Sequence, residues 1–304
     1  MRNRLWALLG QDQFVFVQDP EGLAGPMDGS VAPELVRFTF FWFEETLPPE
    51  KRGESERRER AGIGAMLASL RRPQIGFLFA LMFLQQFAFG GFENLLSLFT
   101  LNRLGMNASS NAGLFIFAGI ILVAVQGGLV GRWSRRFGDR WLVIMGLVVL
   151  GVGLIVMSFT PRVPVPWYSR AALTEELTLE DPDAAAGTPT DEIQIGLPDD
   201  SHVGWLGLGW LALTMIPIAI GGGVLQPSIN SLLTQNVSST EVGGMLGMST
   251  SFLSAANAIT PLVLGAIFQA LGSTAPFLIG GLLLLTLWLL ARSRLPQPGE
   301  PAAG

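Results

Sequence analysis

The sequence predicts an all-α integral membrane protein with six transmembrane helices. Hydrophobic residues make up 49% of the 304 residues, charged residues only 14%, and the mean hydropathy is +0.45. A soluble chain normally carries about a quarter of its residues as charges. The low charge and high hydropathy therefore indicate that lipid surrounds most of the chain.

Six stretches are long and apolar enough to cross a bilayer. A helix rises ~1.5 Å per residue, so about 20 apolar residues span ~30 Å of hydrocarbon. A soluble bundle is a poor alternative, because six such helices would lack the polar face that water requires. The predicted spans are residues 73–101, 110–131, 141–160, 204–233, 242–270 and 275–291.

The spans divide the chain into a membrane domain and two flanks. Residues 73–293 form the six-helix bundle, 1–72 a truncated N-terminal segment with a basic linker, and 294–304 a tail. An apolar run that stops at Glu44 is too short to cross, and we interpret it as the end of a helix whose beginning is missing. Residues 161–203, rich in Pro, Asp, Glu and Ala, predict a solvated loop.

The charges separate by sign along the chain, and this separation predicts the orientation. Residues 51–72 contain seven Lys or Arg and 132–140 contain four, while 161–203 contains nine acids against two arginines. Lys and Arg in short flanks resist translocation. We therefore expect the linker, the loop after the second span and the C-terminus in the cytoplasm, the acidic loop outside, and the protein in the plasma membrane.

The composition also excludes several kinds of function. Cysteine is absent, which excludes disulfides and thiolate sites, and His202 is the only histidine. A metal or catalytic centre would need carboxylates, which lie mainly outside the spans. The net charge of −5 argues against nucleic acid as a partner. We expect neither an enzyme nor a bound cofactor or metal.

The loop after the second span reads Gly131-Arg-Trp-Ser-Arg-Arg-Phe-Gly-Asp-Arg140 and resembles the loop signature of the major facilitator superfamily. Both have a glycine, a basic pair and a second glycine. Three further segments are similar to the end of the family's sixth helix and to its tenth and eleventh helices. They are Phe43-Glu-Glu-Thr-Leu-Pro-Pro-Glu-Lys51, Gly221-Gly-Gly-Val-Leu-Gln-Pro-Ser-Ile-Asn230, and Gly243-Gly-Met-Leu-Gly247 followed by Asn257, Pro261 and Gly265.

The resemblance covers about residues 40–295 and is closest to the drug/proton antiporter branch, which includes tetracycline efflux proteins. It implies that the six spans are helices seven to twelve of a twelve-helix fold, arranged as two inverted three-helix repeats. The implied partners are the lipid bilayer, a small-molecule substrate, protons and a missing N-terminal six-helix half.

The same resemblance implies a cytoplasmic gate in the loop after the second span. Gly131 and Gly138 would let the flanking helices approach, while Arg136 and Arg140 would bind carboxylates or helix C-termini and hold one conformation shut. Arg135 stands where the first-half signature of the family has an aspartate. A complete charge-relay lock is therefore not implied.

Polar residues inside the spans are the candidates for transport, because charge within a membrane is costly. Glu93, the candidate for proton coupling, follows about twenty uncharged residues. Gln86, one heptad earlier, and Asn94, beside Glu93, are candidates for lining a substrate cavity. A partly buried carboxylate has a raised proton affinity and can alternate between protonated and ionised forms, as proton coupling requires. The alternative is that Glu93 lies near the outer surface and reaches water or a partner.

Amide side chains in later spans supply further candidates for a substrate cavity. Gln226 and Asn230 are four residues apart and share a helix face, with Pro227 between them allowing a bend. Asn257 is the third candidate. The alternative for all three is a bond between helices that holds the bundle together without touching substrate.

These observations favour a proton-coupled exporter of small amphiphilic molecules that works by alternating access. This chain would supply one of the two bundles. A symporter of sugars or organic anions is the alternative within transport. A membrane scaffold or sensor that transports nothing, and acts through the acidic loop, is the alternative outside it.

Overall fold

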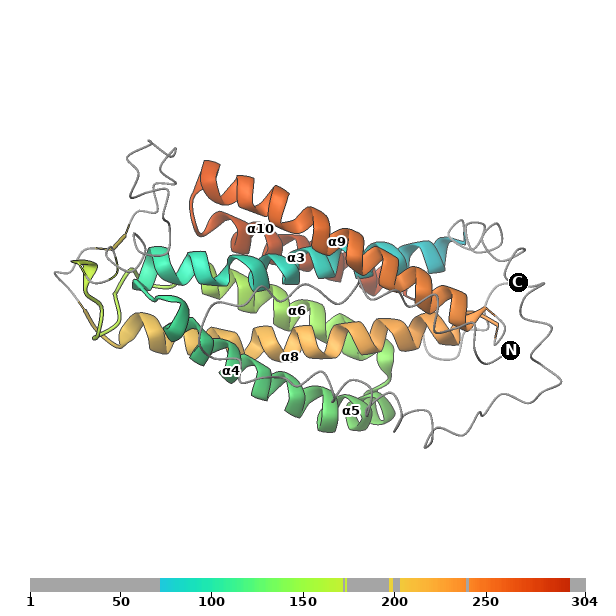
Figure 1. Cartoon of the computed structure of the whole chain (residues 1–304). Coiled ribbons are helices and arrows are strands. Elements are labelled where there is room, and N and C mark those ends of the chain that lie inside the picture. The colour runs from blue at the N-terminus through green and yellow to red at the C-terminus, as the bar shows by residue number, and fades with distance from the viewer. Residues whose placement is uncertain (1–71, 172, 174–196, 199–202, 239–240, 296–304) are drawn as a thin grey trace, which may run out of the picture. The chain divides into compact units, whose positions relative to one another are not determined.

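The computed structural model describes residues 72–171, 173, 197–198, 203–238 and 241–295, and all its regular elements are helices (Figure 1). Six helical stretches are long and apolar enough to cross a membrane, which confirms the predicted fold class. The first 71 residues and most of the acidic loop and of the tail lie outside the described residues. The elements are α3 (Pro73–Leu104), α4 (Ala108–Ala124), η2 (Val125–Leu129), α5 (Val130–Phe137), α6 (Asp139–Ser158), α8 (Leu206–Gln235), α9 (Val242–Leu271) and α10 (Ala275–Arg294).

The second span is longer than predicted. We placed its end at Gly131, but α4 continues through the π-helical turn η2 into α5 and ends only at Phe137. The turn comes at Gly138, whose φ of 81° lies in the left-handed region that favours glycine. The predicted end of the span at Gly131 is therefore too early, because the backbone there stays helical.

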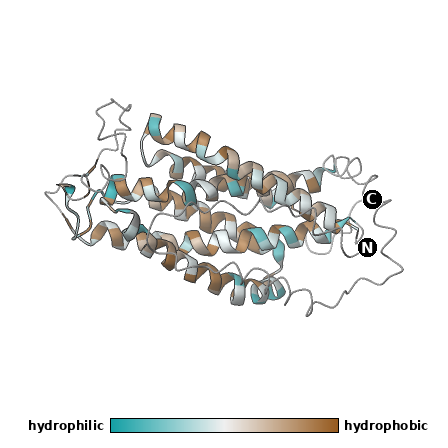
Figure 2. Cartoon of the chain, in the orientation of Figure 1, coloured by the Kyte–Doolittle hydropathy of each residue, from teal (hydrophilic) through white to brown (hydrophobic). Residues whose placement is uncertain are grey.

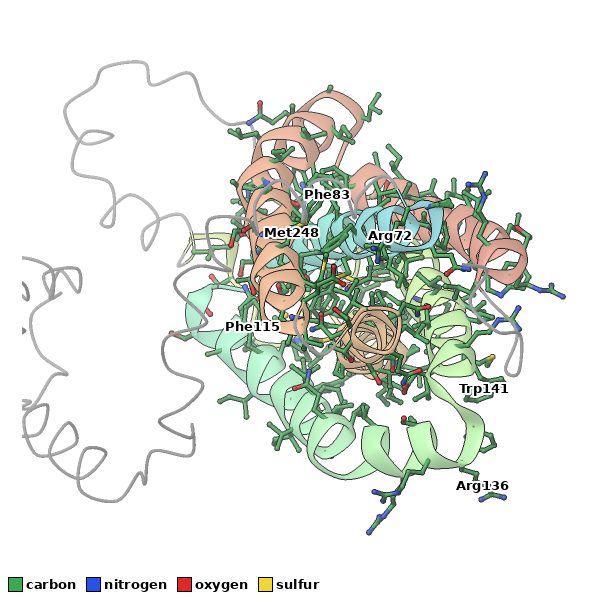
Figure 3. The ribbon with its side chains drawn as sticks, turned by 90° about the vertical axis from the view of Figure 1, so that its right-hand side faces the viewer. Arg72, Phe83, Phe115, Arg136, Trp141 and Met248 are labelled. Atoms are coloured by element: carbon green, nitrogen blue, oxygen red, sulfur yellow. The ribbon has the colours of Figure 1, made fainter. Side chains whose placement is uncertain are left out.

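Helix α8 runs through the middle of the bundle. It packs along α6 and also contacts α3 and α4, while α6 packs against α10 and α3 against α9 and α10. Figure 3, which looks along the bundle, shows α8 nearly end-on with the other helices around it. The core between α6 and α8 is built from fully buried residues that include Leu147, Leu150, Leu211, Met215 and Ile218.

Glycines let α6, α8 and α10 approach backbone to backbone. A Cβ added at Gly221 of α8 would lie 2.7 Å from the backbone nitrogen of Leu150 in α6. A Cβ at Gly281 of α10 would lie 2.7 Å from the carbonyl oxygen of Gly151 in α6. In a membrane no hydrophobic driving force brings helices together, so they associate through close packing, which small residues at the contact allow.

The six spans are buried very unequally. In the most apolar 18 residues of each span, 11% are buried in the second span and 17% in α9, against 39% to 61% in the other four. Helices α4 and α9 therefore pack mainly on one side and leave a broad face uncovered. Apolar residues predominate along the helices, as Figure 2 shows.

Candidate functional site

Gln86 and Asn257, two of the candidates for a substrate cavity, lie together between α3 and α9. The Nε2 of Gln86 donates a hydrogen bond of 2.9 Å to the Oδ1 of Asn257. Gly90, one turn further along α3, leaves room for the amide, since a Cβ there would lie 3.3 Å from the Asn257 Oδ1. Thr260 adds a contact of 3.4 Å from its Oγ1 to the carbonyl oxygen of Phe87.

Glu93 lies further along the same side of α3 as Gln86, and its side chain is exposed. Its carboxylate has no hydrogen bond or ion pair within the part of the chain that the structure describes. It lies 11 residues before the end of α3 at Leu104, or about 16 Å at ~1.5 Å per residue. The neighbouring Asn94 is also exposed, and its Nδ2 donates to the carbonyl oxygen of Gly90 on its own helix at 2.7 Å.

The exposed side of α9 is polar in its middle. Ser251, Ser254 and Asn257 are all exposed there, at positions within two turns of one another. The Ser251 hydroxyl donates to the carbonyl oxygen of Gly247 at 3.2 Å, which satisfies it within the helix. Lipid tails cannot satisfy the remaining polar groups, so this face suits contact with protein or water.

Gln226 and Asn230 of α8 are half-buried and do not join the Gln86–Asn257 pair. Among the described residues neither forms a side-chain hydrogen bond, and the Asn230 Oδ1 is buried without a partner. Sequence reasoning missed two polar residues that lie next to the candidates in the chain, Gln85 and Ser228. Each is 1% exposed and has a buried side-chain oxygen without a partner among the described residues. Their positions, beside Gln86 and between Gln226 and Asn230, could have identified them.

A second polar cluster lies at the end of the bundle where the arginines gather. We call it the arginine end. The Arg140 guanidinium donates from Nη2 to the carbonyl oxygen of Arg292 at 3.2 Å, which places the start of α6 beside the end of α10. The described arginines of this end are Arg72, Arg132, Arg135, Arg136, Arg140, Arg292 and Arg294 (Figure 3).

Asp139 connects α6 to α8 at the arginine end. Its Oδ2 accepts hydrogen bonds from the Ser231 hydroxyl at 2.6 Å and the Gln235 amide at 2.9 Å, and its Oδ1 accepts from the Ser134 hydroxyl at 2.5 Å. Sequence reasoning missed this residue. An acid directly after the turn glycine, in the first turn of a helix, was the available signal.

No described helix packs closely against the two gate glycines. A Cβ at Gly131 or at Gly138 would meet no described atom within 4 Å. Gly131 lies in α5 and Gly138 directly follows it, and both are exposed. Their role in a gate stays a prediction. Arg135 and Arg136 are also exposed, and the Arg136 guanidinium lies 5.3 Å from the centre of the Phe137 ring.

These sites favour hydrogen bonding and proton binding over covalent chemistry. Among the described residues no group of three or more His, Asp or Glu side chains is arranged to hold a metal ion. The polar groups along α3 and α9 are amides, hydroxyls and the Glu93 carboxylate. Such groups can bind a polar solute or a proton.

The family model of the Major Facilitator Superfamily matches residues 31–174, a little under half of the chain. The match includes α3 to α6 and ends in the loop that follows, so α8, α9 and α10 lie beyond it. Searches of curated proteins and of solved structures gave no match. Members of the family are transporters and not enzymes. The family match and the six membrane-length helices together support membership of the major facilitator superfamily, and with it a membrane transporter of the major facilitator type.

Proposed function

We propose that this chain is the C-terminal half of a proton-coupled exporter of small amphiphilic molecules. It would work by alternating access against a second six-helix bundle. The supporting observation is the exposed polar side of α3 and α9, where Glu93 and Asn94 lie on one helix and Ser254 and Asn257 on the other. A cavity with these groups would offer amides to a polar substrate and a carboxylate to a proton.

Glycines of the second span and of α9 support a second bundle as the partner. A Cβ added at Gly127 or Gly128 in η2, or at Gly243 or Gly247 in α9, would meet no described atom within 4 Å. Small residues in membrane helices serve close helix packing, as Gly221 does inside this bundle. We infer that the uncovered face of α4 and α9 packs against the N-terminal half.

Transport of a named probe tests the proposal. The chain would be produced with and without the coding sequence upstream of Met1, in cells that lack their own multidrug exporters. Ethidium efflux that needs the upstream sequence and collapses with the proton gradient supports the proposal. Efflux by the chain alone would contradict the need for a second bundle. If amphiphilic cations are exported neither with nor without the upstream sequence, the proposal that the protein is an exporter is contradicted.

Gly247→Leu tests the uncovered face separately. The larger side chain should leave insertion and helix content unchanged but block packing of the second bundle, and so abolish transport. Gly209→Leu is the matched control, because a Cβ at Gly209 would also meet no described atom within 4 Å. Gly209 shares its side of α8 with the exposed Leu206 and Leu213, which suit lipid. Equal transport by the two variants would contradict the assignment of this face.

We also propose that the arginine end is cytoplasmic in the plasma membrane. The Arg140–Arg292 contact brings the start of α6 beside the end of α10, so the arginines near these two positions face the same compartment. The positive-inside rule favours the cytoplasm for such arginines. A reporter after Ser55 or after Arg294 should be cytoplasmic, and one inserted near Ala185 external. A cytoplasmic reporter at Ala185 would overturn this orientation.

A further inference from the structure

A groove at the arginine end remains unused by the proposed transport function. It has a volume of about 170 Å³ and lies where α5, α6 and α8 meet. None of its lining residues comes from α3 or α9, the helices that carry Glu93 and Asn257. The side chains that define it are Trp133 and Phe137 of α5, Trp141 and Met145 of α6, and Ile220 and Val224 of α8.

The lining of the groove is entirely apolar. A polar solute would therefore lose its hydrogen bonds to water on entering and gain none in return. Hydrocarbon has no such cost, and a membrane supplies it at high concentration. Trp141 is 43% exposed and Met145 37% exposed, so the groove opens on the outer side of the bundle.

Positive charge at the mouth of the groove is not neutralised within the described part of the chain. Arg136 is exposed and forms no ion pair there, and its guanidinium lies beside Phe137, which lines the groove. The nearby carboxylate, Asp139, already accepts hydrogen bonds from neutral donors, those of Ser134, Ser231 and Gln235. An anion from outside the protein can therefore pair with the Arg136 guanidinium.

The aromatic rim connects the charged mouth to the apolar groove. The rings of Phe137 and Trp141 stack with their centres 4.7 Å apart, and the Arg136 guanidinium lies 5.3 Å from the Phe137 ring. Arg136 and Trp141 both lie at the periphery of the bundle and point away from α8 (Figure 3). Tryptophan and arginine are typical residues of the boundary between hydrocarbon and headgroups.

We propose that this groove binds an anionic phospholipid, with one acyl chain along the apolar lining and the phosphate at Arg136. Basic pockets between helices at the cytoplasmic surface recognise anionic headgroups in this way. On the orientation proposed above, the lipid comes from the cytoplasmic leaflet. The site is independent of substrate and proton coupling.

Tryptophan fluorescence can test this site directly, because Trp133 and Trp141 line the groove. The purified chain would be placed in bilayers with either phosphatidylglycerol or phosphatidylcholine carrying brominated acyl chains, which quench nearby tryptophans. We expect stronger quenching by the phosphatidylglycerol at equal mole fraction. The preference should disappear in the double variant Trp133→Phe, Trp141→Phe. Equal quenching of the wild type by both lipids would overturn the proposal.

Two arginine variants test the headgroup contact. Arg136→Gln should lower the apparent affinity for phosphatidylglycerol roughly 5-fold, while Arg294→Gln, which removes the same charge at the same end, should retain most of it. Neither variant should prevent folding, because both side chains are exposed. An unchanged preference in a folded variant contradicts the site. Displacement by soluble glycerol phosphate would show a free-anion site and overturn the lipid assignment.

Discussion

The Nε2 of Gln86 donates a hydrogen bond to the Oδ1 of Asn257, 171 residues away in the chain, at 2.9 Å. It is a side-chain link between α3 and α9, two helices that share the proposed cavity face. Because Asn257 is exposed while Gln86 is 8% exposed, the link lies at the border between bundle and cavity. It therefore has a structural effect that can be measured apart from transport.

A double-mutant cycle with Gln86→Leu and Asn257→Leu should give a coupling free energy of about 0.6 kcal/mol for unfolding, the usual value for a hydrogen bond between membrane helices. The measurement is reversible unfolding in mixed micelles with increasing sodium dodecyl sulfate. Asn94→Leu is the control, because its amide bonds to Gly90 within α3 and should not couple to Asn257. A coupling of zero for the first pair would show that the bond contributes nothing.

Asp139→Ala should destabilise the bundle on the order of 2 kcal/mol or more, because the donors of Ser134, Ser231 and Gln235 lose their shared acceptor. Asp139→Asn should cost less, since one carbonyl oxygen remains. Unfolding midpoints measure both. Glu241→Ala is the control at a half-buried acid that accepts from Ser238 at a helix start, where a loss of about 1 kcal/mol is expected. Equal losses at Asp139 and Glu241 would contradict a special role for Asp139.

Gly138→Ala should destabilise the turn between α5 and α6 by roughly 1–2 kcal/mol, since φ at this position is 81°. The cause is backbone strain, as no described atom lies within 4 Å of the added Cβ. Gly131→Ala is the matched control. It lies in the helix α5 with the same open surroundings, so it should stabilise by about 0.5–1 kcal/mol. The same sign of change at both positions would contradict this account.

Glu93→Gln should uncouple transport from the proton gradient, because the amide keeps the shape of the side chain but cannot take up and release a proton. In vesicles that contain the complete transporter, proton-driven uptake should collapse while exchange of labelled for unlabelled substrate persists. Glu241→Gln is the control at a described carboxylate outside the cavity face. Accumulation against a gradient by Glu93→Gln, with unchanged pH dependence, would leave the proton carrier to be sought in the second bundle.

The six spans could be predicted from the sequence because a bilayer imposes one length and one polarity on every crossing helix. Predicted starts at Pro73, Val242 and Ala275 coincide with the observed ones. The extension of the second span to Phe137 could not be predicted this way. Residues 132–137 are partly charged, so hydropathy ends at Gly131 although the helix does not.

The candidate site was less accessible from the sequence. The pattern singled out Gln86 and Asn257 one by one, as polar residues in apolar helices, but not as a pair. Asp139 stood within a quoted motif and was overlooked, since its partners Ser231 and Gln235 lie 92 and 96 residues away. Contacts of that kind depend on which helices are neighbours, and hydropathy does not specify neighbours.

The sequence by itself determined the solvent of this protein, the number of its spans and the separation of its charges, because these follow from the free energy of transferring each segment between water and lipid. Only the tertiary structure decided which polar groups meet and which remain unpaired. It also decided that, within the described part of the chain, α4 and α9 keep an uncovered face with glycines that no other helix contacts. The physical reason is that packing is a property of helix pairs. Gly221 and Gly247 are the same residue in similar apolar helices, but only Gly221 has the backbone of another described helix against it.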